Sequence, residues 1–444
     1  MTESENNIFA RYEISKQDID NMNNKVKLSD TNEDLNLYCY ISCTEEDEPL
    51  IKHCRGVVFD HENNLVMNTF PYTMEYEHTR EDNIRNYLES VFKDCSFYDS
   101  HEGALLRMFN YNDVWYLSTH RKLNAFRSKW SSPNSFGVLF EKALDTEFEY
   151  NEELLKVVPQ NNNLTNLERF QSILDKNKQY MFLVCNNKDN RIVCLPPSKP
   201  TLFHVGTFID GELVMTENCY IPYPKKHTFS SLEELLDHVS NVDIRNLQGI
   251  ICFAPNNNQL KINNKEYSTL FNVRGNEPSI KFRYLQVRND RKTVNSLYNL
   301  YPDSNSTFDE IENIIYEICK TIYSAYVQRY IKKKFITVPK EEFSVMRECH
   351  KWHEEDRRMN RININKILEV FNTQTATNVN KMIRRFRLES MKKTEEKTEI
   401  KERKRSNTVS TNPSPYLSSN LNSRETSPLI LSNTPSTVPV NLKL

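Results

Sequence analysis

The sequence predicts an α+β fold dominated by antiparallel sheet, followed by an all-α domain and a disordered C-terminal tail. Short apolar or alternating runs bounded by Asn, Asp, Gly or Pro recur as far as Ala254, a pattern typical of β-strands. Apolar residues then repeat at helical spacing. From about Lys392 a charged run passes into a segment rich in Ser, Thr, Pro and Asn, which cannot bury enough apolar surface to fold. We therefore expect domains at residues 1–300 and 306–390 and a tail at 392–444.

Length and composition agree with this division and exclude several classes of protein. The 444 residues are too many for one average domain, and only 38 % of them are apolar. No apolar run approaches the roughly 20 residues that span a bilayer, and residues 1–16 lack the basic and apolar regions of a signal peptide. The ten cysteines are scattered without a Cys-x-x-Cys pair, so we expect reduced, mostly buried thiols. We expect a cytoplasmic or nuclear protein with no membrane partner and no metal site.

Seven runs have the length and composition of β-strands, and most of the seven glycines lie beside them. These runs are residues 55–60, 105–111, 114–119, 181–185, 191–195, 202–208 and 249–254. The polar clusters at residues 110–113 and 186–190 are typical of hairpin turns. Helical patterns interrupt the strands at residues 80–93, 135–145, 163–176 and 230–240. For the last of these helices, Ser230 and Glu233 have the spacing of a capping box.

The C-terminal half combines helical periodicity with positive charge. Apolar residues at helical spacing are Ile311, Ile314, Ile315, Ile318, Ile322, Tyr326 and Tyr330, and a second such stretch covers residues 362–371. Between Arg274 and Arg405 there are 29 Lys and Arg against 19 Asp and Glu, whereas the rest of the chain has 29 against 41. This basic half indicates a polyanionic partner, and nucleic acid is the leading candidate.

A series of short motifs in the β-rich part is similar, in the same order, to those of one enzyme family. The motifs are His53-Cys-Arg-Gly56 followed by VVFD, Phe70-Pro71 with the aromatic and acidic residues 72–77, Ser100-His-Glu-Gly103 followed by ALLRMF, residues 114–122 (VWYLSTHRK), residues 180–184 (YMFLV) followed by RIVC and LFHVG, Gln248-Gly-Ile-Ile251, and Gln259-Leu-Lys-Ile262. Over roughly residues 35–285 the chain resembles the phage-type ATP-dependent RNA ligases of the covalent nucleotidyltransferase superfamily.

The resemblance implies a fold, cofactors and a partner. It implies an antiparallel-sheet-rich nucleotidyltransferase domain (an ATP-grasp-like ligase domain), ATP and Mg²⁺ as cofactors, RNA as the partner and RNA repair as the context. Motif residues expected to contact the nucleotide are Arg55, Glu102, Gly103, Arg121, Gln248 and Lys261, with Lys265 nearby.

The departures from the family pattern bear on catalysis. In the family a lysine attacks the α-phosphate of ATP, and the resemblance places Ser100 at that position. A serine hydroxyl has a much higher pKa than a site-activated amine, and its AMP ester would be a poor donor for a second transfer. His101 is adjacent, but neighbouring strand positions point to opposite faces, so we do not expect it to replace the lysine. Leu183 lies near the position of a ribose-binding Glu, and Gln248 replaces a metal-binding Glu, for which an amide is a poorer ligand.

Further candidate sites lie in the basic half. Residues 276–284 alternate apolar residues with Lys281 and Arg283, so one face could be basic and bind nucleic acid, although an ordinary half-buried strand would have the same pattern. Arg384, Arg385 and Arg387 could also bind nucleic-acid phosphates, and so could the run Lys332-Lys-Lys334, although solvated helix faces have the same composition. His350 and His353 have a spacing compatible with a metal, but a charged amphipathic helix accounts for it equally.

Three functions remain open at this point. The leading hypothesis is a catalytically impaired RNA-ligase-like protein, a pseudoenzyme that binds RNA or a nucleotide through the former active-site groove and the basic helices. The first alternative is an active RNA ligase or capping-type nucleotidyltransferase that uses a displaced lysine, such as Lys122. The second is a scaffold whose helices and tail recruit protein partners. The first two differ in whether a covalent nucleotide adduct forms, and the scaffold differs from both in a weak, salt-insensitive affinity for RNA.

Overall fold

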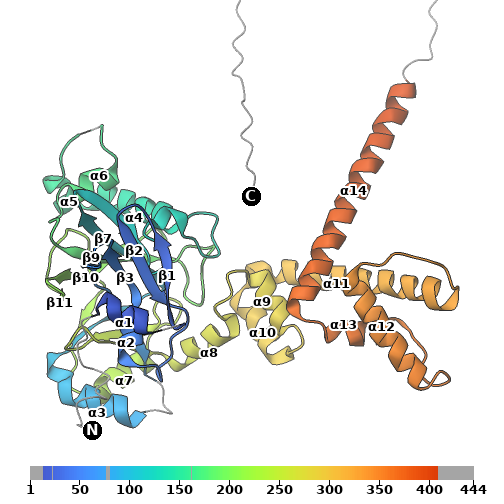
Figure 1. Ribbon diagram of the computed structural model, residues 1–444, viewed down its shortest axis with the longest axis horizontal. Coiled ribbons are helices and arrows are strands. Elements are labelled where there is room, and N and C mark those ends of the chain that lie inside the picture. Colours follow the sequence, from blue (N-terminus) through green and yellow to red (C-terminus); the bar gives the residue numbers. More distant parts are fainter. Residues whose placement is uncertain (1–13, 23, 77–80, 162, 409–444) are drawn as a thin grey trace, which may run out of the picture. The chain divides into compact units, whose positions relative to one another are not determined.

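The computed structural model describes residues 14–22, 24–76, 81–161 and 163–408. The chain divides into two compact units, Met1–Ile383 and Arg384–Leu444. In the first unit three β-sheets are followed by helices, as Figure 1 shows by the change from blue and green ribbons to yellow and orange ones. This α+β architecture with a helical C-terminal part confirms the predicted fold class.

The smallest sheet is built from the N-terminal segment. Its order is β1 (Val26–Thr31), β2 (Leu35–Tyr40), β3 (Arg55–Asp60) and β4 (Leu65–Met67), all antiparallel. Helix α1 (Lys16–Asn21) begins with a capping box formed by Ser15 and Asp18, and α2 (Pro49–His53) leads directly into β3.

Two five-stranded sheets form the centre of the β-rich part. One has the order β11 (Glu212–Val214), β10 (Leu202–Ile209), β9 (Gln179–Cys185), β7 (Gly103–Tyr111) and β8 (Val114–Ser118). The other has the order β12 (Lys226–His227), β6 (Ser96–Ser100), β13 (Gly249–Phe253), β14 (Gln259–Asn263) and β5 (Met74–Glu75). Neighbouring strands are antiparallel except β5 and β14, which run parallel.

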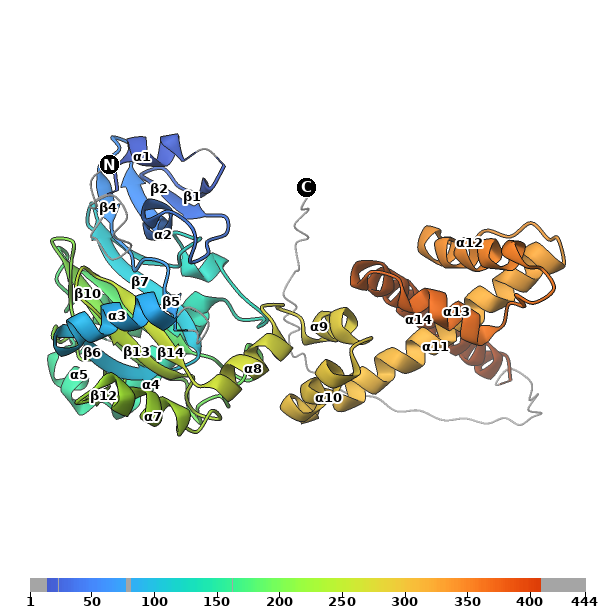
Figure 2. The ribbon, with the colours of Figure 1, turned by 90° about the horizontal axis from the view of Figure 1, so that it is seen from below.

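Alternation along the strands sorts their side chains into outer and inner faces. On the outer faces, Phe182 packs under α4 (Phe136–Tyr150), α5 (Glu152–Val157) and α6 (Asn166–Gln171), and Ile250 packs under α3 (Glu81–Val91) and α7 (Leu232–Ser240). Figure 2 shows α3 lying across the sheet of β6, β13 and β14. The inner faces share one core, in which the Phe70 ring lies 5.4 Å from Phe208 of one sheet and 5.9 Å from Phe253 of the other.

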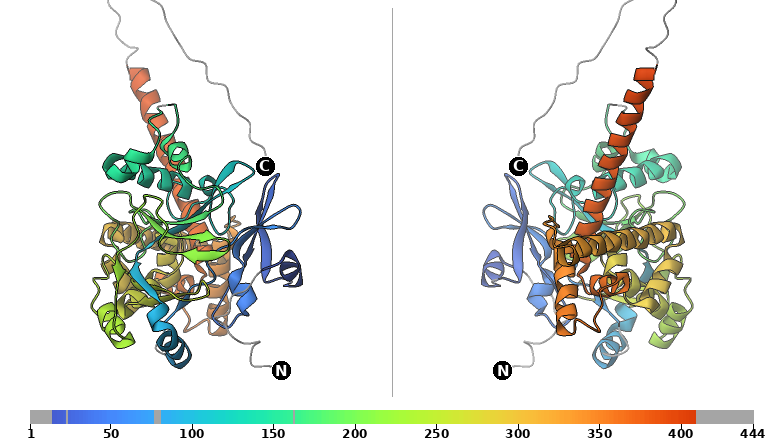
Figure 3. Two further views of the ribbon diagram at one scale, coloured as in Figure 1. Left: turned by 90° about the vertical axis from the view of Figure 1, so that its left-hand side faces the viewer. Right: turned by 90° about the vertical axis from the view of Figure 1, so that its right-hand side faces the viewer.

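Helices follow from the end of the last strand. They are α8 (Lys265–Arg274), α9 (Ile280–Val287), α10 (Arg291–Leu300), α11 (Asn305–Tyr326), the π-helical turn η4 (Val327–Ile331), α12 (Lys340–Glu355), α13 (Ile364–Asn372) and α14 (Ala376–Thr408). Ile315 and Ile322 of α11, Val345 of α12 and Phe371 of α13 are fully buried among them. Helix α14 runs from Ala376 to Thr408 and therefore includes residue 383, where the first unit ends. Figure 3 draws this helix in dark orange.

Most predicted strands and helices are present, with shifts of a few residues at their ends. The hairpin predicted at residues 110–113 is confirmed, with Asn112 and Asp113 in the left-handed conformation at φ 49° and 63°. The predicted cap of α7 is displaced by one residue, because Ser231 rather than Ser230 accepts the N–H of the first turn. All ten cysteines are unpaired, and seven of them are buried. Among the described helices none is long and apolar enough to cross a membrane.

Two strand predictions are wrong. Residues 191–195 form no strand, so 186–190 is no hairpin turn, and β9 pairs instead with β7 and β10. Within residues 276–284 the chain enters α9, because the Ser279 side chain accepts the N–H of Phe282 and begins a helix. Helix α14 continues to Thr408, beyond the predicted start of the tail, and residues 409–444 of that tail lie outside the described residues.

Candidate functional site

A cavity of about 350 Å³ lies between the inner faces of the two central sheets. Much of the lining comes from strands of these two sheets, namely Tyr98 and Ser100 of β6, Gly103 and Leu105 of β7, Leu183 of β9, Ile251 and Phe253 of β13, and Gln259 and Lys261 of β14. Tyr40, Phe70, Tyr72, Val205 and Met215 add apolar and aromatic wall. The charged groups in the lining are Arg55, Glu75, Asp99 and Lys261. An apolar, aromatic pocket with a few polar groups is the usual form of a small-molecule site.

Ser100 lies at the end of β6, where this strand pairs with Gly249 of β13. The residue is 4 % exposed, and its carbonyl oxygen accepts the N–H of Gln248 at 2.8 Å. His101 also lines the cavity and stacks on Phe203 with 4.7 Å between ring centroids. We expected alternation along a strand to point His101 away from the face of Ser100. This expectation is wrong, because β6 ends at Ser100 and His101 is no longer part of the strand. Burial lowers the pKa of His101, so the imidazole is neutral at pH 7.

Lys261 is the lysine that the cavity contains. It stands opposite Glu75 in the parallel pairing of β14 and β5, and both side chains line the cavity. No described residue forms a hydrogen bond or ion pair with the Lys261 ammonium. Burial lowers its pKa, and the nearby carboxylates of Glu75 and Glu102 offset only part of this effect. A half-buried amine without a partner is suited to bind a phosphate.

Arg55 begins β3 and is held beside the cavity by two hydrogen bonds. It donates hydrogen bonds to the Pro71 carbonyl at 3.3 Å and to the Thr73 hydroxyl at 3.1 Å. The next residue, Gly56, has φ 87°, and a Cβ there would lie 2.5 Å from the His120 carbonyl oxygen. Only glycine fits both the left-handed backbone and this close approach.

A buried arginine supports this segment from within the core. Arg107 of β7 is 1 % exposed, and its guanidinium donates to the carbonyls of Gly56 and Thr119 and to the Ser118 hydroxyl. Burial without a carboxylate partner lowers the pKa of Arg107 to about 9. Arg107 thus joins β7, β8 and the start of β3, directly beside Arg55.

Gln248 presents an unsatisfied oxygen at the cavity wall. The residue is 5 % exposed, and its buried Oε1 has no hydrogen-bond partner among the described residues. Within the same residues no group of three or more His, Cys, Asp or Glu is placed to hold a metal. The carboxylate and amide oxygens in the lining belong to Glu75, Asp99, Gln248 and Gln259. Asp99 is paired with His227 at 2.8 Å, and the Gln259 oxygen accepts the Thr73 hydroxyl at 3.1 Å. This set fits a Mg²⁺ that arrives with a nucleotide's phosphates better than one bound by protein alone.

Some predicted site residues lie elsewhere. The Glu102 carboxylate accepts three main-chain N–H groups, from Ile192 at 3.1 Å, Val193 at 2.6 Å and Cys194 at 3.0 Å, so it shapes the loop that replaces the predicted strand. Arg121 is exposed and donates to the Tyr40 and Ile41 carbonyls at 3.3 and 3.1 Å.

Lys122, the displaced-lysine candidate, also lies outside the cavity lining. Its ammonium is 3.3 Å from Asp30. The structure therefore brings together Arg55, Gly103, Gln248 and Lys261 but leaves Glu102 and Arg121 out of the lining. Sequence reasoning missed Glu75, whose pairing with Lys261 depends on a parallel contact between distant strands.

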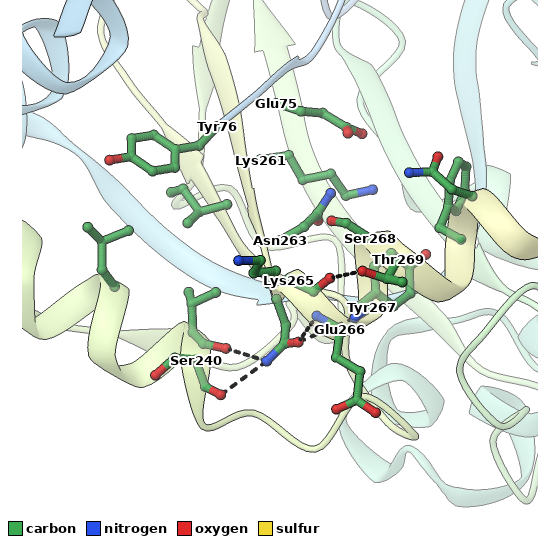
Figure 4. A pocket seen from close by; sticks show the side chains of 16 residues that line it. Glu75, Tyr76, Ser240, Lys261, Asn263, Lys265, Glu266, Tyr267, Ser268 and Thr269 are labelled. Carbon is green, nitrogen blue, oxygen red and sulfur yellow. Dashed lines mark hydrogen bonds between the residues drawn. The ribbon is translucent and has the colours of Figure 1, made fainter. Parts of the chain in front are cut away.

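A larger cavity of about 920 Å³ adjoins the first, because Glu75 and Lys261 line both. Figure 4 shows Lys261 extending between Glu75 and Asn263, with Lys265, Ser268 and Thr269 on the same space. It lies between β14 and α8, the helix that begins at Lys265 after the cap residue Asn264. Lys261 is thus accessible from a second, more polar chamber.

The residues predicted to bind nucleic acid lie on two helices. Lys281 is exposed on α9, whereas Arg283 of the same helix donates to the Val273 carbonyl at 2.9 Å and the Asn272 carbonyl at 2.8 Å, near the end of α8. On α14, Arg384 is exposed and both Arg385 and Arg387 are half-buried.

The two histidines of α12 are held by other contacts. His350 stacks on Tyr330 with 3.7 Å between ring centroids, and His353 Nδ1 lies 2.6 Å from the Asn360 carbonyl oxygen.

Comparison with known proteins gives viral relatives. No family model matches the chain. The chain is 30 % identical over 295 residues to the "Immediate-early protein ICP-46 homolog" of Invertebrate iridescent virus 3. The aligned region covers 64 % of this chain and 62 % of that protein, so the chain spans less than two thirds of this relative's length. It is 24 % identical over 308 residues to a candidate bifunctional polynucleotide kinase/RNA ligase of Autographa californica nuclear polyhedrosis virus, over 64 % of this chain and 41 % of that protein.

Among solved structures, a candidate ATP-dependent DNA ligase from Aquifex aeolicus matches 68 % of this chain and 80 % of its own, with 11 % identity and a TM-score of 0.37. A TM-score of this size does not by itself establish a shared fold.

Proposed function

We propose that this chain is a ligase-type protein of the nucleotidyltransferase class that binds a nucleotide, or the end of an RNA strand, noncovalently in the cavity between the sheets. One observation carries the proposal. Arg55, Ser100, Gly103, Gln248 and Lys261 come from four separate motifs of the sequence, and all of them line this one cavity. Convergence of residues that were chosen for their likeness to a nucleotide-binding family supports a nucleotide site there.

The chemistry of the cavity supports a nucleotide. The aromatic and aliphatic walls suit a base, and Arg55 and Lys261 supply the positive charge that phosphates need. The RNA-ligase part of the name of the baculovirus relative agrees with this class of ligand. ATP with Mg²⁺ is therefore the first nucleotide to test, and RNA is the partner that we propose.

A noncovalent role follows from the residue at the position of the nucleophile. Ser100 supplies a hydroxyl where the resembling enzymes need an amine, and the lysine that lines the same cavity, Lys261, belongs to a different motif. Leu183 has no group that could accept a hydrogen bond from a ribose hydroxyl. The nucleotide would bind, but transfer of its AMP group through Ser100 would not be supported.

A second candidate function is favoured by Lys261. Its pKa is lowered by burial, which increases the fraction of free amine. If Lys261 attacked the α-phosphorus of a nucleoside triphosphate, an N–P bond would form while the P–O bond to pyrophosphate broke. The protein would then be an active transferase with a relocated nucleophile, and the covalent adduct would map to Lys261.

Nucleotide titration tests the binding proposal. The purified full chain is titrated with ATP and with GTP, each with and without Mg²⁺, by calorimetry. We expect binding that Lys261→Met weakens about 10- to 100-fold, because a charge-assisted contact to phosphate contributes roughly 1.5–3 kcal/mol. Lys122→Met, which removes a lysine outside the cavity, is the matched control and should leave affinity unchanged. Absence of binding by the folded wild type, or equal losses in both variants, would refute the proposal.

A further inference from the structure

A basic loop with an exposed aromatic residue follows the π-helical turn η4. This loop, Lys332–Phe335, presents three consecutive lysines and then Phe335, whose side chain is 94 % exposed. Ile331 before it is 64 % exposed. Most large apolar side chains of the surrounding helices are buried, so Phe335 is an exception that packing does not explain.

Hydrogen bonds fix the loop onto η4, so its side chains are presented by a defined backbone. The N–H of Lys332 donates to the Val327 carbonyl, and the N–H of Lys334 donates to the Gln328 carbonyl, both at 2.9 Å. Lys333 between them has φ 56°, a left-handed conformation that a side-chain-bearing residue adopts at a cost. A glycine would be the natural choice for this turn unless the lysine side chain has a use.

The charges of the loop are not neutralised by neighbouring residues. No described carboxylate lies within ion-pair distance of the ammonium groups of Lys332, Lys333 or Lys334. Lys333 and Arg357 of the segment after α12 both approach His350 closely enough to lower its pKa further, beyond the effect of its burial. The nearby helix α12 carries the carboxylate of Glu354. This carboxylate lies 3.6 Å from His350 Nε2 and 3.4 Å from the Arg357 guanidinium, so it pairs with these groups and not with the lysines of the loop.

We infer that the Lys332–Phe335 loop binds a single-stranded nucleic acid, with its lysines on the phosphates and the Phe335 ring stacked on an unpaired base. Single-stranded chains present alternating negative charges and flat π-faces, which is the combination that this loop complements. Duplexes keep their bases stacked internally, so Phe335 would gain nothing from them. The inference goes beyond the proposed nucleotide site, because it requires neither the cavity nor Lys261.

Fluorescence anisotropy with labelled oligonucleotides tests the inference. The full-length chain is titrated with oligo(rU), with oligo(dT) and with a duplex of equal length. We expect a higher affinity for the single strands than for the duplex. A difference between the affinities for oligo(rU) and oligo(dT) shows whether the loop prefers RNA or DNA. Phe335→Ala should weaken single-strand binding roughly 5- to 100-fold, whereas Phe335→Trp should retain it. Tyr150→Ala, which removes another exposed aromatic side chain that lies beside Lys199, is the control.

The lysines are tested by the salt dependence of binding. Replacing Lys332, Lys333 and Lys334 together by Gln should reduce the slope of log affinity against log salt by about 2, since each phosphate contact on a single strand contributes roughly 0.7. The control variant replaces three other exposed lysines, Lys27, Lys129 and Lys142, by Gln. Its slope of log affinity against log salt should stay close to that of the wild type.

Three outcomes would overturn the inference. The first is a duplex affinity as high as the single-strand affinity. The second is a Phe335→Leu variant that binds single-stranded oligonucleotides as tightly as wild type. The third is a set of loop variants that lose binding to vesicles of anionic lipid but not to oligonucleotides. The result is independent of the nucleotide site, because Lys261→Met should still bind oligonucleotides and Phe335→Ala should still bind ATP.

Discussion

Lys261 and Glu75 set the electrostatics of the cavity, although they lie far apart in the sequence. Their positions follow from the parallel pairing of β14 and β5. The lysine is the second inward position of β14, after Gln259, while Leu260 and Ile262 point to the outer core. Burial of the Lys261 ammonium removes some of its hydrogen bonds to water, and no described side chain replaces them. A bound phosphate would supply charge-assisted hydrogen bonds in their place.

Nucleotide affinity should therefore depend on pH through Lys261. Its pKa is lowered from the usual value of 10.5, and a bound phosphate would raise it again. Below the lowered pKa the amine is protonated with or without ligand, so affinity is constant. Above it binding requires uptake of a proton, and affinity falls as pH rises, by up to tenfold per pH unit. Calorimetry between about pH 8 and pH 10 measures this fall, in a range where the phosphates no longer titrate.

The control for the pH effect is Lys261→Met, which should bind weakly with a flat profile over the same range. A wild-type affinity that stays constant up to the usual pKa of a lysine would contradict the assigned role of this residue.

Arg107 should be the most destabilising single arginine to replace in this part of the core. Arg107→Met removes three hydrogen bonds and leaves the buried carbonyls of Gly56 and Thr119 without donors. We expect a loss of about 2–4 kcal/mol in the free energy of unfolding, measured by urea titration. Arg245→Met, which removes an exposed arginine paired with Asp243, should have a much smaller effect. Equal effects of the two changes would show that the Arg107 contacts do not stabilise the fold.

At the scale of the elements, the cavity depends on the close approach of β7 and β9. A Cβ at Gly103 would lie 2.5 Å from the Val184 carbonyl oxygen, and main-chain atoms of a central strand cannot move aside cheaply. Gly103→Ala should therefore destabilise the protein by about 2–4 kcal/mol and lower nucleotide affinity together. At Gly137 the three atoms nearest to a Cβ all belong to the Phe126 side chain rather than to the main chain, so Gly137→Ala is the comparison variant. Thermal unfolding of the two variants compares them, and a neutral Gly103→Ala would contradict the packing described.

Sequence patterns predicted the strands well where the main chain itself supplies the hydrogen bonds. Strand β3 matches the predicted run 55–60, and β8 and β10 match the predicted runs 114–119 and 202–208 to within one residue. The run 191–195 has strand composition, but the Glu102 carboxylate takes its N–H groups, a contact between residues about ninety positions apart. Local composition cannot contain that information.

The candidate site shows the same limit. Ser100, Gln248 and Lys261 were recognised through short motifs, and the structure places all three in one cavity. The motifs could not indicate that Glu102 and Arg121 are used elsewhere, nor that His101 lines the cavity because β6 ends at Ser100. Each of these depends on where a strand stops or on which distant group supplies a hydrogen-bond partner.

At the scale of the whole molecule, charge is divided between an acidic β-rich part and a basic helical part. The helical part contains the Lys332–Phe335 loop and Lys281, and α14 carries Arg384 with Arg385 and Arg387. An acidic part that holds one nucleotide and a basic part that holds a strand would together favour the end of a nucleic acid over free nucleotide. The contributions of Lys281 and of the three arginines of α14 remain predictions.

A gain-of-function variant tests the proposed role of Ser100 from the other direction. Ser100→Lys returns an amine to the cavity wall, where Arg55 and Lys261 could bind the phosphates. We expect this variant to form a covalent nucleotide adduct with ATP and Mg²⁺ that Ser100→Met, the uncharged control, does not form. Intact-mass spectrometry detects the adduct. An adduct on Ser100→Met as well would locate the nucleophile elsewhere.

The most direct test of a noncovalent site is the mass of the wild-type protein itself. The full chain is incubated with ATP or GTP and with Mg²⁺ or Mn²⁺, then measured intact and after digestion. We predict nucleotide binding in the titration but no increase in mass, because the proposed function places the Ser100 hydroxyl at the position of the nucleophilic amine. A mass increase of one nucleoside monophosphate, mapped to Lys261 or to any other residue, would contradict this account.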